Sequence, residues 1–321
     1  MLSRTADHLF WMARYTERAE NTARMLNVTF DTALLPQSAA AAERSWRALL
    51  GISELQEVYD EKYGAMSQTD VLNFMVRDTD NPSSIASCLT MARENARAVR
   101  GVLTTEVWEA ENTTWLGMHS ELLDGALERD PSGFFEWVKH RSHLSRGVII
   151  GTMLKDEAFY FIRLGTFLER ADNTARILDT KFHGARKTAD NLHLEKAQDA
   201  SPDFYYWAAL LRSVSAFEIY RKVYRDVITP ARIAELLILR GDMPRSLLAC
   251  MDDVVANLSQ VRNDISADTE RFAGKLQAGL KFGTIEEIFD AGLHDFLEDF
   301  LKNIYELGGR ISSDFLLPGQ G

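Results

Sequence analysis

Two ten-residue stretches of this sequence carry the same acidic, amide and basic side chains at the same spacing. Residues 15–24 read Tyr-Thr-Glu-Arg-Ala-Glu-Asn-Thr-Ala-Arg, and residues 167–176 read Phe-Leu-Glu-Arg-Ala-Asp-Asn-Thr-Ala-Arg. Seven of the eight positions from Glu17 to Arg24 are identical to those from Glu169 to Arg176. A match of this length within one chain indicates either a duplication or one chemical requirement that is met twice.

On a helix, the shared polar side chains form a row along the border of an apolar stripe. Glu17, Asn21 and Arg24 recur at i, i+4 and i+7, which places them on one side of the helix. The second copy repeats this row with Glu169, Asn173 and Arg176. Arg18 and Arg170, which follow the two glutamates, are expected to point roughly away from the stripe. A row that is partly withdrawn from water needs partners, because an unpaired buried charge is costly.

Three kinds of chemistry fit such a row. The glutamate and arginine could pair along the helix or across to the other copy, which would fix how the helices pack. Alternatively, a polar pocket between the two helices could hold an anionic or amide-bearing ligand. The third option is metal, because two helices with four carboxylates, Glu17, Glu20, Glu169 and Asp172, resemble a di-iron bundle. Such bundles use Glu-x-x-His pairs, and neither copy contains histidine, so no metal site is expected.

The elements that must position these rows are two helices. Apolar residues recur every three or four positions through both copies, and small residues occupy the middle of each stripe. These small residues are Ala19 and Ala23 in the first copy and Ala171 and Ala175 in the second. Small side chains let a neighbouring helix approach closely. We therefore predict that the two motif helices pack together near a pseudo-twofold axis, with their polar rows facing a shared site.

The rest of the chain also has helical patterns. Prolines fall mostly at helix boundaries, Thr284 and Glu287 form a capping box, and no alternating strand pattern is evident. Helices are expected at residues 43–62, 68–76, 85–100 and 105–127. Residues 183–202 are the best candidate for a linker or surface loop. The prediction is an all-α helical bundle that forms one domain of two pseudo-repeated halves, residues 1–150 and 151–321.

Two further places carry arginines that could bind a ligand. Residues 92–100 resemble the motif, with a Glu-Asn pair followed by arginine, and their arginines share one helix face. The candidate binding residues there are Arg93, Asn95, Arg97 and Arg100. They indicate either a solvated face or a site for carboxylate or phosphate. Arg245 stands near the start of a helix, where the helix dipole disfavours a cation, which hints at a protein or ligand partner.

Composition limits the class of protein. The chain has 321 residues, of which 46% are hydrophobic and 26% charged, as is ordinary for a folded soluble protein. A formal net charge of −11 argues against a general nucleic-acid binder and does not favour anionic membranes. Cys88 and Cys250 sit in apolar contexts, and no signal peptide or membrane-spanning run is evident. We expect a cytoplasmic protein without a nucleic-acid or membrane partner and without a cofactor.

Several stretches resemble the bacterial Alpha-E family. The resemblance begins with residues 3–24, which contain the first motif copy, and spans almost the whole chain. It continues in Ala92–Arg100, Glu106, Trp108, Phe159–Arg176, Ser213–Tyr224 and Met243–Ser246. The resemblance implies an all-helical cytoplasmic protein whose partner is a circularly permuted ATP-grasp protein, with transglutaminase-like proteases as frequent genomic neighbours. It thereby implies a role in ATP-dependent formation of an amide or peptide bond, or in processing its product.

Three functions stay open at this point. The chain could be a non-catalytic or substrate-presenting partner of an ATP-grasp ligase, and it could bind a small anionic or peptide ligand. It could instead be an enzyme in which Glu17 or Glu169 acts as general base while arginines bind the substrate. That role requires carboxylates whose pKa is raised by burial. Finally, it could be a structural scaffold whose motif residues are packing salt bridges.

Overall fold

The computed structural model describes residues 1–34, 38–192 and 201–317, without the side chains of residues 183–203. Within these ranges the chain forms helices and no strand, which confirms the all-α prediction. The first half contains α1 (Ser3–Ala33), α2 (Ala39–Ile52), α3 (Gln56–Tyr63), α4 (Gln68–Val76), α5 (Ile85–Ala98), α6 (Thr105–Leu123), α7 (Ala126–Arg129) and α8 (Pro131–Thr152). The second half contains α9 (Glu157–Leu192), α10 (Ser201–Ser213), α11 (Phe217–Tyr224), α12 (Pro230–Ile238), α13 (Leu247–Gln260), α14 (Ala267–Phe282), α15 (Ile285–Ala291) and α16 (Leu293–Ile311).

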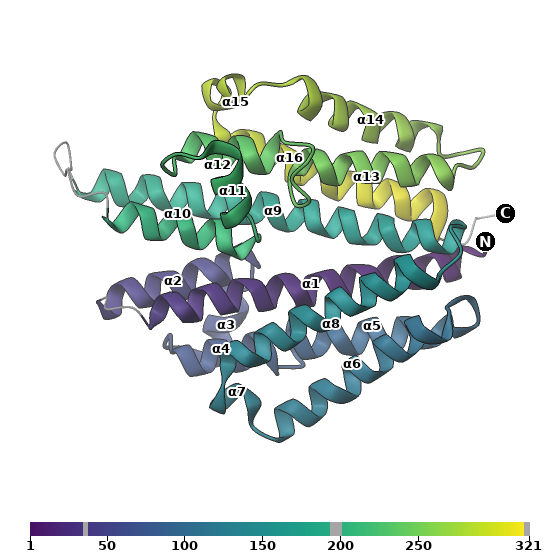
Figure 1. Cartoon of the computed structure of the whole chain (residues 1–321), viewed down its shortest axis with the longest axis horizontal. Coiled ribbons are helices and arrows are strands. Elements are labelled where there is room, and N and C mark those ends of the chain that lie inside the picture. Colours follow the sequence, from purple (N-terminus) through teal and green to yellow (C-terminus); the bar gives the residue numbers. More distant parts are fainter. Residues whose placement is uncertain (35–37, 193–200, 318–321) are drawn as a thin grey trace.

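The two motif helices, α1 and α9, lie side by side through the middle of the molecule (Figure 1). Small residues permit this contact: Ala19 and Ala171 are buried, and a Cβ atom on Gly165 would stand 2.2 Å from the carbonyl oxygen of Phe10. A glycine is therefore required where the backbones approach most closely. The prediction that the two motif helices pack together is confirmed.

Each central helix is covered mainly by helices of its own half. Helices α5 and α8 pack against α1, and α13 and α16 pack against α9. In Figure 1 helices α4, α5, α6 and α7 of the first half lie below the central pair, and α12 to α16 of the second half lie above it. The helices follow one another in a similar order in the two halves, but the duplication of whole halves stays a prediction. No helix among the described residues is long and apolar enough to cross a membrane.

The helix boundaries differ from the sequence expectations at three points. The helix expected at 43–62 is broken between α2 and α3, where Glu54 takes a φ of 56°. The helix expected at 105–127 ends at Leu123, because Gly125 adopts a left-handed conformation that ends α6 before α7 begins. Helix α9 continues to Leu192, and within the expected linker 183–202 residues 193–200 lie outside the described residues.

The structure confirms the helix caps predicted from the sequence at the starts of α12 and α15. Thr284 and Glu287 form the expected capping box at the start of α15. Thr229 caps α12 with its hydroxyl, and Pro230 occupies the first turn, where its missing N–H costs nothing. These signals are local to a few residues, which is why the sequence alone reveals them.

Candidate functional site

The Glu-Arg dipeptides of the two copies bind each other across the α1–α9 contact. Glu17 accepts two hydrogen bonds from Arg170, at 2.8 and 2.9 Å. Glu169 accepts two from Arg18, at 2.6 and 3.0 Å. The expectation that Arg18 and Arg170 point away from the stripe is therefore wrong. The helices lie so close together that an arginine on the flank of one reaches the glutamate of the other.

A second ion pair forms along each motif helix. Arg24 donates to Glu20 at 2.8 Å, and Arg176 donates to Asp172 at 2.8 Å. In the first copy, the pair along the helix is thus formed by Glu20 rather than Glu17. The i, i+4 spacing brings Glu20 and Arg24 together. Glu17 instead binds arginines from other parts of the chain.

The first copy receives an arginine from the segment that leads into α13. Arg245 donates to Glu17 at 3.0 Å, to Glu20 at 2.6 Å and to the side-chain oxygen of Asn21 at 2.9 Å. The hydroxyl of Thr174 donates to the carbonyl of Arg245 at 2.9 Å and helps to hold this segment in place. The partner that the position of Arg245 suggested is therefore the motif of α1.

Helix α8 supplies further groups to the first copy. Arg146 donates to Glu17 at 3.0 Å and also to Glu20, and Ser142 donates to Glu20 at 2.7 Å. The ring nitrogen Nε2 of His143 lies 3.3 Å from Arg24. Sequence reasoning missed Ser142 and Arg146. Their i, i+4 spacing was visible, but nothing in the sequence showed that α8 faces the motif of α1.

The charges around the first copy do not balance. We use the name arginine cluster for the two glutamates of the first copy and the four arginines that bind them: Glu17, Glu20, Arg24, Arg146, Arg170 and Arg245. Four guanidinium groups against two carboxylates leave a surplus of two positive charges. Burial outweighs the attraction of the glutamates and lowers the pKa of Arg245. In addition, the amide nitrogen of Asn21 is buried without a hydrogen-bond partner.

The second copy is balanced. Its second cluster contains three arginines and three carboxylates: Arg14, Arg18, Arg176, Glu54, Glu169 and Asp172. Asn173 donates to the backbone carbonyl of Glu169 at 2.8 Å and takes no part in the ion pairs. A depression of about 220 Å³ adjoins this cluster at Arg176. Its other charged groups already have partners, since His294 contacts Asp179 and Lys302 contacts Glu298.

The pKa values of the motif glutamates move away from those of a general base. Burial opposes ionisation of Glu17, but Arg170 and Arg245 outweigh it and lower its pKa. For Glu169, burial is outweighed by Arg14 and Arg18, and the pKa falls to about 2. The raised pKa that the general-base hypothesis requires is absent from both carboxylates. Groups this acidic are weak proton acceptors near neutral pH.

One carboxyl that the sequence did not single out does have a raised pKa. Glu111 on α6 is fully buried, and this burial outweighs its hydrogen bond from Ser145 and raises its pKa. Ser145 and Arg146 also line a small cavity of about 10 Å³ next to Thr16. Glu111 is thus a protonatable group close to the arginine cluster, because it contacts Ser145 and Thr16, which are the neighbours in sequence of Arg146 and Glu17.

The arginines of residues 92–100 belong to a different surface. Arg93 lies over the ring of Trp115, and Arg100 lies over the ring of Trp108, both of which are on α6. Arg97 is exposed and pairs with Glu94 at 2.6 Å. Asn95 is held by His8 on α1, whose ring nitrogen lies 2.8 Å away. The structure therefore does not bring these four candidate residues to the arginine cluster.

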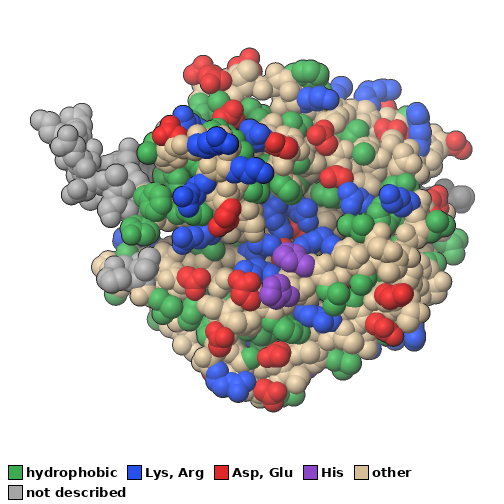
Figure 2. Space-filling view, in the orientation of Figure 1, with side chains coloured by type: hydrophobic (Ala, Val, Ile, Leu, Met, Phe, Trp, Pro, Cys, Tyr) green, Lys and Arg blue, Asp and Glu red, His purple; other side chains and the backbone are tan. Residues whose placement is uncertain are grey.

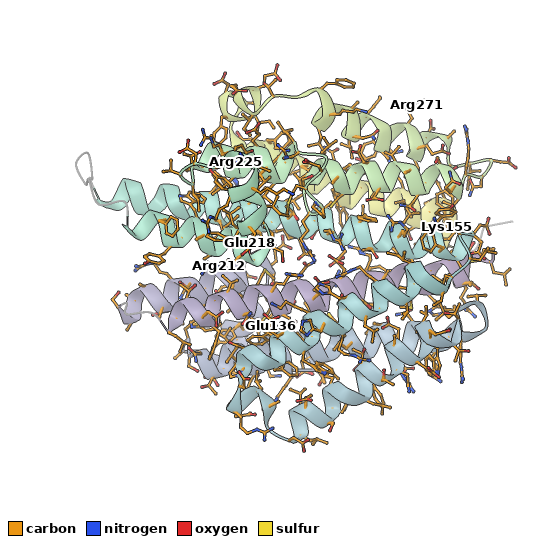
Figure 3. All side chains as sticks on the ribbon, viewed as in Figure 1. Glu136, Lys155, Arg212, Glu218, Arg225 and Arg271 are labelled. Atoms are coloured by element: carbon orange, nitrogen blue, oxygen red, sulfur yellow. The ribbon has the colours of Figure 1, made fainter. Side chains whose placement is uncertain are left out.

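The arginine cluster opens to the surface on one face. Figure 2 shows lysine or arginine and histidine side chains gathered in a hollow at the centre of this face. His143 is half exposed, whereas the side chains of Arg24 and Arg245 are only 9% exposed. In Figure 3 Arg212, on α10, and Glu218, on α11, lie near each other, just above α1 in this view. No group of three or more metal-ligating side chains occurs among the described residues.

A comparison with known families assigns the chain. Residues 1–316 match the profile of the Alpha-E family, described as a predicted alpha-helical domain with a conserved ER motif. The chain belongs to the Alpha-E family. Two Glu-Arg dipeptides of this member, Glu17-Arg18 and Glu169-Arg170, form the reciprocal pairs between its central helices.

Relatives of this Alpha-E protein are longer chains. An uncharacterised protein of Mycobacterium bovis is 26% identical over 323 residues, which covers 94% of this chain and 35% of the relative. Uncharacterised proteins of two Mycobacterium tuberculosis strains match over the same length, with 26% and 25% identity. The chain thus spans about a third of the length of these relatives. No solved structure matches it.

Proposed function

We propose that this Alpha-E protein binds an anionic substrate at the arginine cluster. It would present that substrate to a circularly permuted ATP-grasp protein that forms an amide or peptide bond. The observation that carries the proposal is the surplus of two positive charges around Glu17 and Glu20. Buried guanidinium groups without a counter-charge are costly, and an anionic ligand removes that cost.

The chemistry of amide formation fits a site of this kind. An amide bond joins a carboxyl group to an amine, so one of the two substrates is anionic before it is activated. Arginine is the side chain best suited to bind a carboxylate or phosphate, because its planar head donates two parallel hydrogen bonds. The arginine cluster offers such donors and reaches the surface at Arg146, whose side chain is 24% exposed, beside the half-exposed His143.

The length of the relatives supports a role beside a second component. In the mycobacterial proteins the matching region covers only 35% of the chain, so this unit occurs there within a larger protein. A domain that works together with a second one is expected to occur in some proteins joined to further domains in one chain. The identity of the partner as an ATP-grasp protein rests on the family resemblance.

Two alternatives receive different support. An enzyme with Glu17 or Glu169 as general base requires a raised pKa, and both pKa values are lowered. A purely structural scaffold is favoured by the second cluster, where carboxylates and arginines balance. It does not account for the arginine surplus of the first copy. The substrate-presenting role explains both clusters, because one then serves packing and the other binding.

The test measures ADP formed by a circularly permuted ATP-grasp protein of the same organism, supplied with small molecules extracted from the same cells. We expect wild-type protein to increase ADP formation, and Arg146→Gln to lose most of that increase. Arg14→Gln is the matched control, because Arg14 also binds a motif glutamate but lies in the balanced cluster. Equal activity of all three proteins, or no effect of the wild type, would contradict the proposal.

A further inference from the structure

We infer that the group of the anionic substrate recognised by the arginine cluster is a doubly charged phosphate rather than the carboxylate that would form the amide bond. This inference names the ligand chemistry of the site and therefore rests on the proposed function. Three features of the cluster support it: its net charge, its unused donors and the carboxylate of Glu20 that two of its arginines share.

The net charge selects a dianion. Arg24, Arg146, Arg170 and Arg245 supply four positive charges, and the two motif glutamates remove two. A single carboxylate would leave one positive charge uncompensated, whereas a phosphate monoester near neutral pH carries close to two negative charges. Neutralising both surplus charges gives the largest relief of desolvation cost at a buried site.

The unused groups of the cluster are hydrogen-bond donors. Among the described residues, Arg146 bonds only through its Nη1 atom, to Glu17, Glu20 and Ser142, so its Nε and Nη2 atoms have no partner within the protein and are available to a ligand. The amide nitrogen of Asn21 is also unpaired, and only 4% of this residue is exposed. Free donors require an acceptor, and the three terminal oxygens of a phosphate provide several.

The donors are close enough to bind one compact group. The carboxylate of Glu20 binds Arg24 and Arg146 at once, so their guanidinium groups lie beside each other. Arg24 also contacts Ser215 and lies 3.3 Å from the ring nitrogen of His143. A ligand with two separate carboxylates would hold its two negative charges farther apart than the oxygens of one phosphate. A single tetrahedral oxyanion can contact several of these donors from different directions.

The depth of the site suits a charged group attached to a larger molecule. Arg24 and Arg245 form the floor, with side chains that are 9% exposed. Arg146 is 24% exposed, and His143, which is 51% exposed, stands at the mouth of the hollow. The phosphate would bind at the floor while the rest of the ligand extends past His143 toward the surface shown in Figure 2.

The test is a titration of wild-type protein with inorganic phosphate, sulfate, glutarate and acetate at matched ionic strength, followed by thermal unfolding and calorimetry. We expect phosphate and sulfate, the compact dianions, to bind and to raise the Tm. Glutarate, whose two charges are far apart, and acetate should have little effect. Equal stabilisation by acetate or glutarate would overturn the inference, as would the absence of phosphate binding.

Two variants locate the site. Arg146→Gln should weaken phosphate binding at least about tenfold, because it removes one charge and its free donors. Since this change also touches buried carboxylates, His143→Ala at the half-exposed mouth is the second variant, and a smaller loss of affinity is expected. Arg14→Gln should bind phosphate like the wild type. Unchanged affinity in both Arg146→Gln and His143→Ala would show that phosphate binds elsewhere.

The outcome also separates the inference from the proposed function. If phosphate does not bind but the protein still increases ADP formation by the ATP-grasp partner, the ligand is another anion and only the inference fails. If phosphate binds at the cluster and ADP formation is unaffected, the inference stands and the proposed partnership fails.

Discussion

The two motif copies contain nearly the same residues, but the clusters of charged side chains around them differ in net charge. In the second copy, three arginines and three carboxylates satisfy one another around Glu169. In the first copy, four arginines surround Glu17 and Glu20 and leave two positive charges without a counter-charge. A balanced cluster explains how the two central helices are held together. A cluster with surplus charge is a candidate for binding.

The difference comes from outside the motif. The segment before α13 reads Met-Pro-Arg-Ser and the segment before α5 reads Asn-Pro-Ser-Ser, so Ser83 stands where Arg245 stands in the second half. Both segments end in a serine that caps the following helix. The second difference is Arg146, which α8 contributes to the first copy. Two arginines outside the motif therefore change the character of the site.

The largest expected effect follows from removing the most heavily bonded carboxylate. Glu17→Ala leaves the buried Arg170 without its carboxylate partner and removes one of the two glutamates that Arg146 and Arg245 share, and we expect a loss of about 3–5 kcal/mol in the free energy of unfolding. Urea denaturation measures this loss. The control is Glu54→Ala, since Glu54 is mostly exposed and should cost less than about 1 kcal/mol. Similar losses for the two variants would remove the distinction between buried and surface pairs.

A pH titration tests the second copy. The pKa of Glu169 falls from 4.5 to about 2 on folding, so it contributes stability above pH 4.5 that is lost as the pH falls toward 2. This contribution is about 3 kcal/mol. We expect the free energy of unfolding of Glu169→Gln to depend less on pH between 4.5 and 2 than that of the wild type. Parallel pH profiles for the two proteins would contradict the buried ion pair.

The sharpest comparison replaces one arginine in each cluster. Arg14→Gln breaks the balance of the second cluster and should cost about 2 kcal/mol in the free energy of unfolding. Arg146→Gln removes part of a surplus, so the lost hydrogen bonds are offset by weaker repulsion, and we expect a cost below about 1 kcal/mol. The two side chains are similarly exposed, at 18% and 24%. A larger loss for Arg146→Gln would show that the first cluster carries no surplus.

The smallest expected effect on stability concerns the buried carboxyl group of Glu111. The pKa of Glu111 is raised by burial, so its contribution to stability is greatest at low pH and declines as the pH rises above 4.5. Glu111→Gln, which cannot ionise, should therefore be more stable than the wild type at pH 8 and similar to it at pH 4. Thermal unfolding at the two values measures this, with the exposed Glu106→Gln as control. A loss of stability at pH 8 would contradict the prediction.

Parts of the site could be predicted because they depend on local spacing. The helical period of the motif and the small residues Ala19 and Ala171 indicated two helices in close contact. The predicted orientation of Arg18 and Arg170 was wrong. A residue on the flank of one helix contacts the other helix only when that second helix has a suitable position and tilt, which local spacing does not reveal. The break at Glu54 was missed as well, because the residue that takes the positive φ is a glutamate and the nearby Gly51 still lies within α2.

The order of residues alone was enough to predict an all-helical protein of the Alpha-E family with two nearly identical polar motifs. Helical periodicity and capping depend on neighbours within a few residues, so they can be read from the order of residues. Which of the two motifs carries surplus positive charge depends on how distant helices pack around it. Arg146 and Arg245 lie more than a hundred residues from Glu17, and the packing of α8 and α13 around the central helices brings these charges together.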